Sequence, residues 1–193
     1  MAPSRRINVL TDLIAKSLPE GSKVLDIGCG DGKIDSLIKE LKPSVLIEGI
    51  DVLLRDRSFI KVTKFDGNRI PFDDDHFDFT LLIDVLHHTD DPSIILKEAK
   101  RVSKKHVLIK DHAREGFLAE ATLRFMDYVG NARHGVYLPY HYLDNSEWEV
   151  LFKKTELTVA QRKDILNLYP FPAGLLFDRK LHFFAALDCH KGR

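Results

Sequence analysis

The segment VLDIGCGDG (residues 24–32) is the part of this 193-residue chain that is most informative about its fold. Its apolar residues predict a short strand at Lys23–Ile27, and its glycines predict a sharp turn. An amphipathic run at Ile34–Leu41 predicts a helix directly after the turn. Glycine suits the turn because it adopts positive φ and allows the backbone to approach a ligand closely. The N-terminus of the helix has unpaired N–H groups and a positive partial charge, so a carboxylate or a phosphate is expected there.

Strands and helices alternate outward from this stretch as far as residue 110. Four more strands are predicted at Val45–Ile50, Ile60–Phe65, Phe77–Ile83 and Val107–Ile109, and one more helix at Pro92–Val102. The pattern calls for parallel strands joined by right-handed crossovers.

The rest of the chain has a different pattern. A helix that Ser4 could cap is predicted near the N-terminus, and two further helices are predicted at Phe117–Val129 and, capped by Ser146, at Ser146–Lys154. Two strands near Leu157–Ile165 and Lys180–Leu187 could form an antiparallel pair. We expect one domain over residues 1–193, made of an N-terminal helix (4–18), a cofactor half (23–110) and an acceptor-covering C-terminal part (111–193).

The amino-acid composition indicates which classes of binding partner and which cellular compartment to expect. Lys plus Arg equals Asp plus Glu, at 29 each, whereas a nucleic-acid binder usually carries a basic excess. The basic pairs Arg5-Arg6, Lys104-Lys105 and Lys153-Lys154 are expected on the solvated surface. The two cysteines suggest neither a disulfide framework nor a zinc site, so a reducing cytoplasm is expected. No apolar run reaches about 18 residues, so no membrane span is expected.

Asp51 is the second element of a nucleoside site. It follows the second predicted strand, 25 residues after Asp26, where a carboxylate can accept hydrogen bonds from both ribose hydroxyls. The glycine spacing, Asp-x-Gly-x-Gly-x-Gly, differs from the Gly-x-Gly-x-x-Gly that is usual for dinucleotides.

Several segments together resemble the class I S-adenosyl-L-methionine (SAM)-dependent methyltransferases. They are the glycine stretch, Gly49-Ile50-Asp51-Val52, Phe65-Asp66-Gly67, Ile70-Pro71-Phe72, Phe77-Asp78-Phe79, Ile83-Asp84-Val85-Leu86-His87-His88 and Asp91-Pro92. They look like the small-molecule (type 11) group that includes the ubiquinone and menaquinone biosynthesis methyltransferases. The resemblance implies a Rossmann-like, doubly wound, mostly parallel seven-stranded sheet with an antiparallel C-terminal strand and helices on both faces.

The resemblance also implies a cofactor site. SAM would be bound and S-adenosyl-L-homocysteine released. The loop from Gly28 through Cys29 and Gly30 to Gly32 would line the methionine part, and Asp26 would hold its ammonium. Asp51 would bind the ribose, Val52 and Gly67 would lie beside the adenine, and Asp66 would accept from its amino group. Ile83 and Asp84 would lie near the sulfonium and the amino acid. Acidic strand ends suit such a cation better than a pyrophosphate.

Two histidines are the candidate catalytic residues. His88 and His112 are candidates for deprotonating or orienting an acceptor hydroxyl, although each could simply be packed. No metal is expected: Asp84 and Asp111 fall near the magnesium ligands of catechol-type enzymes, but His112 stands where an amide would be needed.

The predicted function is methyl transfer to a small, apolar or aromatic acceptor, because the tail contains Phe117, Phe125, Tyr128, Trp148, Tyr169, Phe171 and Phe177. Two alternatives stay open, a SAM-binding protein without catalysis and an NAD-dependent oxidoreductase. The chain could be a monomer or a homodimer.

Overall fold

A seven-stranded mixed sheet with the strand order β3-β2-β1-β4-β5-β7-β6 forms the centre of the computed structural model. The structure describes residues 4–131 and 138–189. The strands are β1 (Lys23–Ile27), β2 (Leu46–Asp51), β3 (Val62–Lys64), β4 (Phe77–Ile83), β5 (Ser103–His112), β6 (Thr158–Lys163) and β7 (His182–Asp188). β7 runs antiparallel to both of its neighbours, and the other pairings are parallel. The predicted fold class is therefore confirmed, including the antiparallel strand near the C-terminus.

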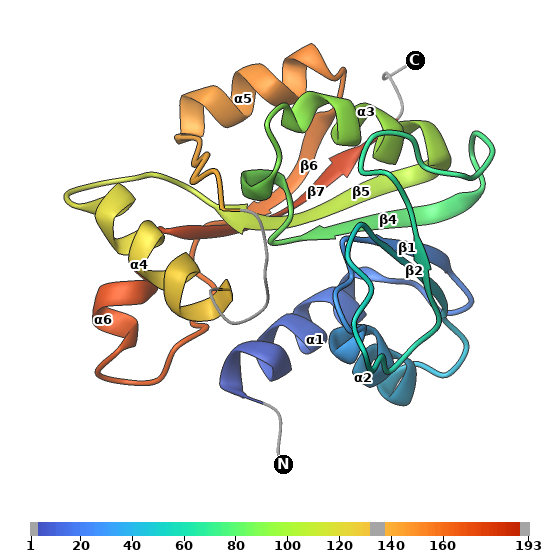
Figure 1. Cartoon of the computed structure of the whole chain (residues 1–193), viewed down its shortest axis with the longest axis horizontal. Helices are drawn as coiled ribbons and strands as arrows, with labels where there is room; N and C mark the ends of the chain where they lie inside the picture. Colours follow the sequence, from blue (N-terminus) through green and yellow to red (C-terminus); the bar gives the residue numbers. More distant parts are fainter. Residues whose placement is uncertain (1–3, 132–137, 190–193) are drawn as a thin grey trace.

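Helices cover both faces of the sheet (Figure 1). On one face, α1 (Arg5–Ser17) and α2 (Lys33–Leu41) place Leu10, Ile14 and Ile38 against Val24 and Leu81. On the other, α3 (Pro92–Val102) and α5 (Asn145–Lys154) add residues such as Leu96 and Trp148 to a second apolar cluster. The central strands are buried on both sides, which explains why β4 is largely apolar in sequence.

The remaining helical segments lie beyond the carboxyl ends of β4 and β5. A short 3-10 helix, η1 (Leu86–His88), follows β4, and α4 (Ala119–Asn131) follows β5. α4 lies close to α6 (Gly174–Phe177) at one end of the molecule (Figure 1), where Phe125 stacks on Phe177. Within the described residues, no helix is both long enough and apolar enough to cross a bilayer.

Three local expectations need correction. The third strand is shorter than predicted, and the fifth runs from Ser103 to His112, because both β4 and β7 pair with it beyond its apolar centre. Ser146 does not cap α5. Asp144 does, by accepting a hydrogen bond from the Glu147 N–H at 2.9 Å, while Glu147 accepts from the Asp144 N–H at 2.8 Å. This reciprocal capping box satisfies two N–H groups that Ser146 alone could not.

Candidate cofactor site

A cavity of about 540 Å³ opens at the carboxyl ends of β1, β2 and β4. This is the point where the strand order reverses direction, and such crevices are the usual ligand sites of open α/β sheets. The predicted cofactor residues in its wall are Asp26, Gly28, Cys29, Gly30, Asp51, Val52, Ile83 and Asp84, and His88 is the predicted catalytic residue among them.

The glycine loop is held against β2 and the segment after β4. Gly28 has φ +75° and donates its N–H to the Ile50 carbonyl at 2.8 Å. A Cβ on Gly28 would lie 2.6 Å from Val85 Cγ2, so any side chain at this position would have to displace Val85. The close packing keeps the loop backbone along the floor of the cavity.

Alanine at position 28 is therefore expected to destabilise the protein. The positive φ and the collision with Val85 together should lower the free energy of unfolding by about 2–4 kcal/mol. Gly21→Ala is a matched control, because Gly21 has φ +72° but open space around its Cβ position, and should cost about 1–2 kcal/mol. Urea denaturation compares the two variants, and equal losses would show that the contact with Val85 is unimportant.

The carboxylate of Asp51 connects the glycine loop to the end of β2 through hydrogen bonds. Its Oδ2 accepts from the Gly30 N–H and its Oδ1 from the Leu53 N–H, both at 2.8 Å. Each carboxylate oxygen can accept a second hydrogen bond, so Asp51 can also receive donors from a ligand in the cavity.

Asp26 lies beneath the same loop and is only 5% exposed. Burial, followed by the neighbouring Asp35 and Asp51, raises its pKa well above the ordinary value for an aspartate. Burial likewise raises the pKa of Asp35 to about 6. Within the described part of the chain, Oδ1 of Asp26 has no hydrogen-bond partner. A buried acceptor without a donor is costly, and a cationic ligand group in the cavity would supply what is missing.

Asp84 lies on the opposite wall, in an ion-pair cluster that the sequence did not reveal. Its carboxylate pairs with Arg6 of α1 and with Lys110 of β5. Burial alone would raise the pKa of Asp84, but Lys110 and Arg6 outweigh it and hold the pKa well below its usual range. Arg6, expected on the solvated surface, instead lines the cavity, and Lys110 is fully buried.

Three predicted cofactor residues lie outside the cavity wall. Gly32 caps α2 in a left-handed conformation, where a side chain would collide with Ile60. Asp66 is exposed, and its Oδ1 accepts the N–H groups of Asn68 and Arg69 at 2.8 Å, as a turn aspartate does. Gly67 lies beside Val52, since a Cβ there would be 3.2 Å from Val52 Cγ1. Contact of these three with adenine or methionine stays a prediction.

Comparison with known proteins agrees with this geometry. A family model described as a methyltransferase domain matches residues 4–162. The chain belongs to this methyltransferase family. The group is that of the class I SAM-dependent methyltransferases, for which SAM is the cofactor.

Individual relatives cover the same region. The chain is 26% identical over 160 residues to a ubiquinone biosynthesis O-methyltransferase of Pelagibacter ubique, covering 76% of this chain and 62% of that protein. It is 33% identical over 94 residues to a tRNA (carboxymethyluridine(34)-5-O)-methyltransferase of Schizosaccharomyces pombe, covering 45% of this chain and 38% of that protein. It therefore spans between 38% and 62% of the length of these relatives. The crystal structure of a SAM-dependent methyltransferase from Aquifex aeolicus has the same fold, with a TM-score of 0.66, 20% identity and coverage of 98% and 94% of the two chains.

Histidines of this methyltransferase chain gather next to the cavity, on the side of β4 and β5. His87 is buried and its Nδ1 lies 2.6 Å from Asp111 Oδ1. Burial alone would lower the pKa of His87, but Asp111 and Asp127 outweigh it and raise the pKa to about 10. Burial and then His87 lower the pKa of His88. His88 is therefore a neutral imidazole at the cavity wall near pH 7, as a general base requires.

His112 is placed differently from the expectation. It is 6% exposed and lies outside the cavity lining. Burial lowers its pKa well below the ordinary value. A direct role of His112 in taking a proton from an acceptor stays a prediction, and His112 would have to act from outside the cavity wall.

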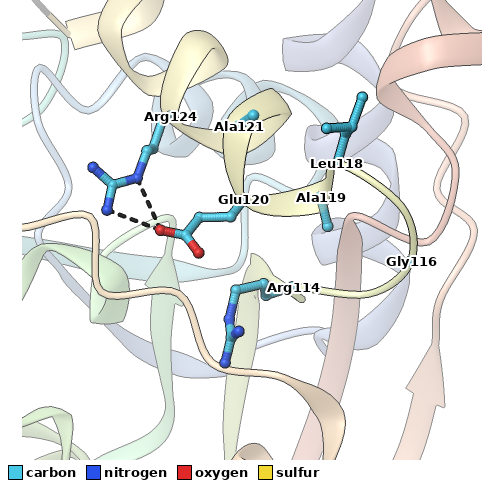
Figure 2. Close-up of a pocket in the computed structure, with 7 residues that line it drawn as sticks. All are labelled: Arg114, Gly116, Leu118, Ala119, Glu120, Ala121 and Arg124. Carbon is cyan, nitrogen blue, oxygen red and sulfur yellow. Dashed lines mark hydrogen bonds and ion pairs between the residues drawn. The ribbon is translucent and has the colours of Figure 1, made fainter.

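A second hollow of the methyltransferase domain, about 490 Å³, lies at the start of α4 and is lined by Arg114, Gly116, Leu118, Ala119, Glu120, Ala121 and Arg124. Figure 2 shows Glu120 and Arg124 pointing toward each other, and Arg124 Nε donates to Glu120 Oε1 at 3.0 Å. The hollow receives no residue from the loops after β1, β2 or β4, so we do not assign it to the nucleoside.

Proposed function

We propose that this chain transfers the methyl group of SAM to a small, apolar or aromatic molecule. One observation carries the proposal: the cavity at the switch point of the sheet contains a buried carboxylate, Asp26, beneath its glycine loop and a second carboxylate, Asp51, at the end of β2. A ligand that combines a cationic amino acid with a ribose matches both.

The residues of the wall suggest how SAM would be held. Asp51 would accept from the ribose hydroxyls, and Val52 and Leu53, which are 52% and 40% exposed, would pack against the adenine. Asp26 would balance the ammonium. The N-terminus of α2 would receive the carboxylate, because its N–H groups point out of the helix.

The main requirement of methyl transfer is that the acceptor atom lies in line with the bond between the methyl carbon and the sulfur of SAM. The reaction is an in-line displacement at the sulfonium carbon and its leaving group is a neutral thioether, so holding the acceptor in line can supply several kcal/mol. A base is needed only for an acceptor that must lose a proton. His88 is our candidate for that step, and Ile83 and Val85 would shape the wall near the methyl group.

The acceptor class rests on the tail of the chain. Exposed apolar side chains are concentrated near α4 and α6, at Phe117, Leu118, Phe125, Tyr128, Val129, Phe171, Leu175 and Leu176. Trp148 does not belong to this group: it is a core residue, and its indole N–H donates to the His112 carbonyl at 2.9 Å. The zero net charge favours a small molecule over a nucleic acid, although one relative is a tRNA methyltransferase.

Transfer of a labelled methyl group tests the proposal. The protein is incubated with methyl-labelled SAM and either a metabolite extract or total tRNA, and label in a small apolar product is expected. Label in tRNA would overturn the acceptor class. SAM binding without any transfer would favour the non-catalytic alternative, and calorimetric binding of NAD but not of SAM would favour the oxidoreductase.

The affinity for SAM is expected to rise with pH. A protonated Asp26 is neutral and cannot balance an ammonium, and the pKa values of Asp26 and Asp35 are raised. Binding should therefore release a proton, and affinity should fall as pH is lowered through the pKa of about 6 of Asp35 and the raised pKa of Asp26. Calorimetry from about pH 5 to about pH 8, in two buffers of different ionisation enthalpy, measures both effects. Asp26→Asn should bind weakly and with a flatter pH profile, and a flat profile in the unaltered protein would contradict the assignment of Asp26.

A further inference from the structure

Three histidines and one aspartate from three elements converge beside the cavity. His87 and His88 belong to η1, His112 ends β5 and Asp127 lies in α4. Asp127 Oδ1 is 3.4 Å from His87 Nε2 and 3.9 Å from His112 Nε2. Ligand atoms of His87, His88 and Asp127 all lie within 4.8 Å of one another. This convergence of donors from distant parts of the chain is produced by the fold, since no short sequence motif contains it.

The spacing matches that of a metal site. In a tetrahedral zinc site with bonds of about 2.0–2.1 Å, neighbouring ligand atoms are about 3.3 Å apart. His87 Nε2 and Asp127 Oδ1 are 3.4 Å apart, so these two atoms already have the separation of neighbouring ligand atoms in such a site. The ligand atom of His88 lies within 4.8 Å of those of His87 and Asp127.

A carboxylate also fixes the orientation of the His87 ring through Nδ1, the nitrogen that would not bind the metal, as is usual for metal-bound histidines. His87 Nδ1 contacts Asp111 Oδ1 at 2.6 Å, which directs Nε2 toward Asp127. Asp111 is in turn fixed by the backbone N–H groups of Leu86 at 3.0 Å and His112 at 2.7 Å. When a histidine binds a metal through one ring nitrogen, a carboxylate on the other ring nitrogen fixes the tautomer of the imidazole and makes the imidazole a stronger ligand.

Two ring nitrogens in the cluster lack ordinary partners. Among the described residues, His88 Nδ1 is a buried atom without a hydrogen-bond partner, and His87 Nε2 meets the hydrogen-bond criteria with no atom although Asp127 Oδ1 lies 3.4 Å away. Burying such groups unpaired costs free energy. A cation between them would account for this arrangement.

We propose that His87, His88 and Asp127 bind a divalent transition-metal ion of the zinc class, with the imidazole of His112, whose Nε2 lies 3.9 Å from Asp127 Oδ1, as a candidate further ligand. Two or three imidazoles with one carboxylate favour zinc or a similar ion over magnesium. The site goes beyond the proposed function and does not depend on it. Because His88 also lines the cavity, the ion would lie beside the place proposed for the acceptor and could polarise an acceptor oxygen. With the ion bound, His88 would act as a ligand, and the ion would replace it in activating the acceptor.

This proposal departs from the expectation of no metal. That expectation considered magnesium on Asp84 and Asp111, but both carboxylates are engaged elsewhere, Asp84 with Arg6 and Lys110, and Asp111 with His87.

Metal titration of the untagged full chain tests the site. After treatment with EDTA, Zn²⁺ is added in competition with a chromophoric chelator, and Co²⁺ is added to record its visible absorption. One ion per chain with a Kd below about 1 µM is expected, together with the intense Co²⁺ bands of a four-coordinate site. Excess Mg²⁺ should not compete.

Variants separate this site from adventitious binding. Asp127→Asn keeps the shape of the side chain and should weaken Zn²⁺ by at least about 100-fold, and Asp111→Asn by about 10–100-fold. His76→Gln, which alters a histidine that contacts Lys23 far from the cluster, should bind normally. His88→Gln provides a second test if a buried variant does not fold, because His88 is only half-buried.

Two results would overturn the proposal: no saturable binding of Zn²⁺ or Co²⁺, or equal affinity in the unaltered chain and in a folded Asp127→Asn or His88→Gln variant. SAM binding, measured separately by calorimetry, distinguishes failure of the metal site from failure of the proposed function.

Discussion

Replacement of Asp51 by alanine is expected to weaken SAM binding by about 100-fold to 10,000-fold. Two hydrogen bonds from ribose hydroxyls to a carboxylate would be lost, each worth about 1.5–3 kcal/mol, and about 1.4 kcal/mol corresponds to a factor of ten in Kd. The variant also loses the contacts of Asp51 with the N–H groups of Gly30 and Leu53, which shape the cavity floor. Calorimetric titration with SAM measures the effect.

Asp31→Ala is the matched control for Asp51. Asp31 also lines the cavity and its Oδ1 accepts from the Lys33 N–H at 3.1 Å, but the residue is exposed. Its loss should change Kd only a few-fold, since exposed charges are screened by water. If the two variants bound SAM equally well, the proposed ribose contact of Asp51 would be wrong.

Replacement of Lys110 by methionine is expected to lower the free energy of unfolding by about 3–5 kcal/mol at neutral pH. Lys110 is fully buried between Asp84 and His182, and its Nζ lies 3.2 Å from His182 Nδ1. Methionine fills the same volume but leaves Asp84 with Arg6 as its main cationic partner. The cost arises mostly from the carboxylate that stays buried with less compensation. Urea denaturation monitored by circular dichroism gives the difference.

Lys105→Met is the matched control for Lys110→Met, because both lysines lie in β5. Lys105 also pairs with an aspartate, Asp78, at 3.2 Å, but its side chain is 53% exposed. Its removal should cost less than about 1 kcal/mol. Adding Asp84→Asn to Lys110→Met should restore part of the stability, because the uncompensated charge is then removed. An equal loss for Lys105→Met and Lys110→Met would contradict the role assigned to the buried pair.

The periodicity of residues 23–110 was sufficient to predict the sheet. Apolar strands ending in glycine or aspartate, separated by amphipathic helices, allow few topologies other than parallel strands with right-handed crossovers. The glycine stretch and Asp51 could be predicted to lie together because both follow strand ends, and parallel strands bring those ends to one edge of the sheet. The length of β5 could not be predicted in this way. Lys110, Asp111 and His112 look like a polar loop, and only their pairing with β7 places them inside the protein.

Local periodicity and short motifs were enough to predict the fold class, the family and the edge of the sheet where the cavity lies, because they encode strand ends and tight turns. Which distant charges meet could be seen only in the folded molecule. Arg6 reaches Asp84 across 78 positions, and Asp127 approaches His87 from a helix that no motif predicts beside η1. Such contacts arise from the packing of whole elements, and they depend on side-chain direction and burial, which residue spacing does not encode.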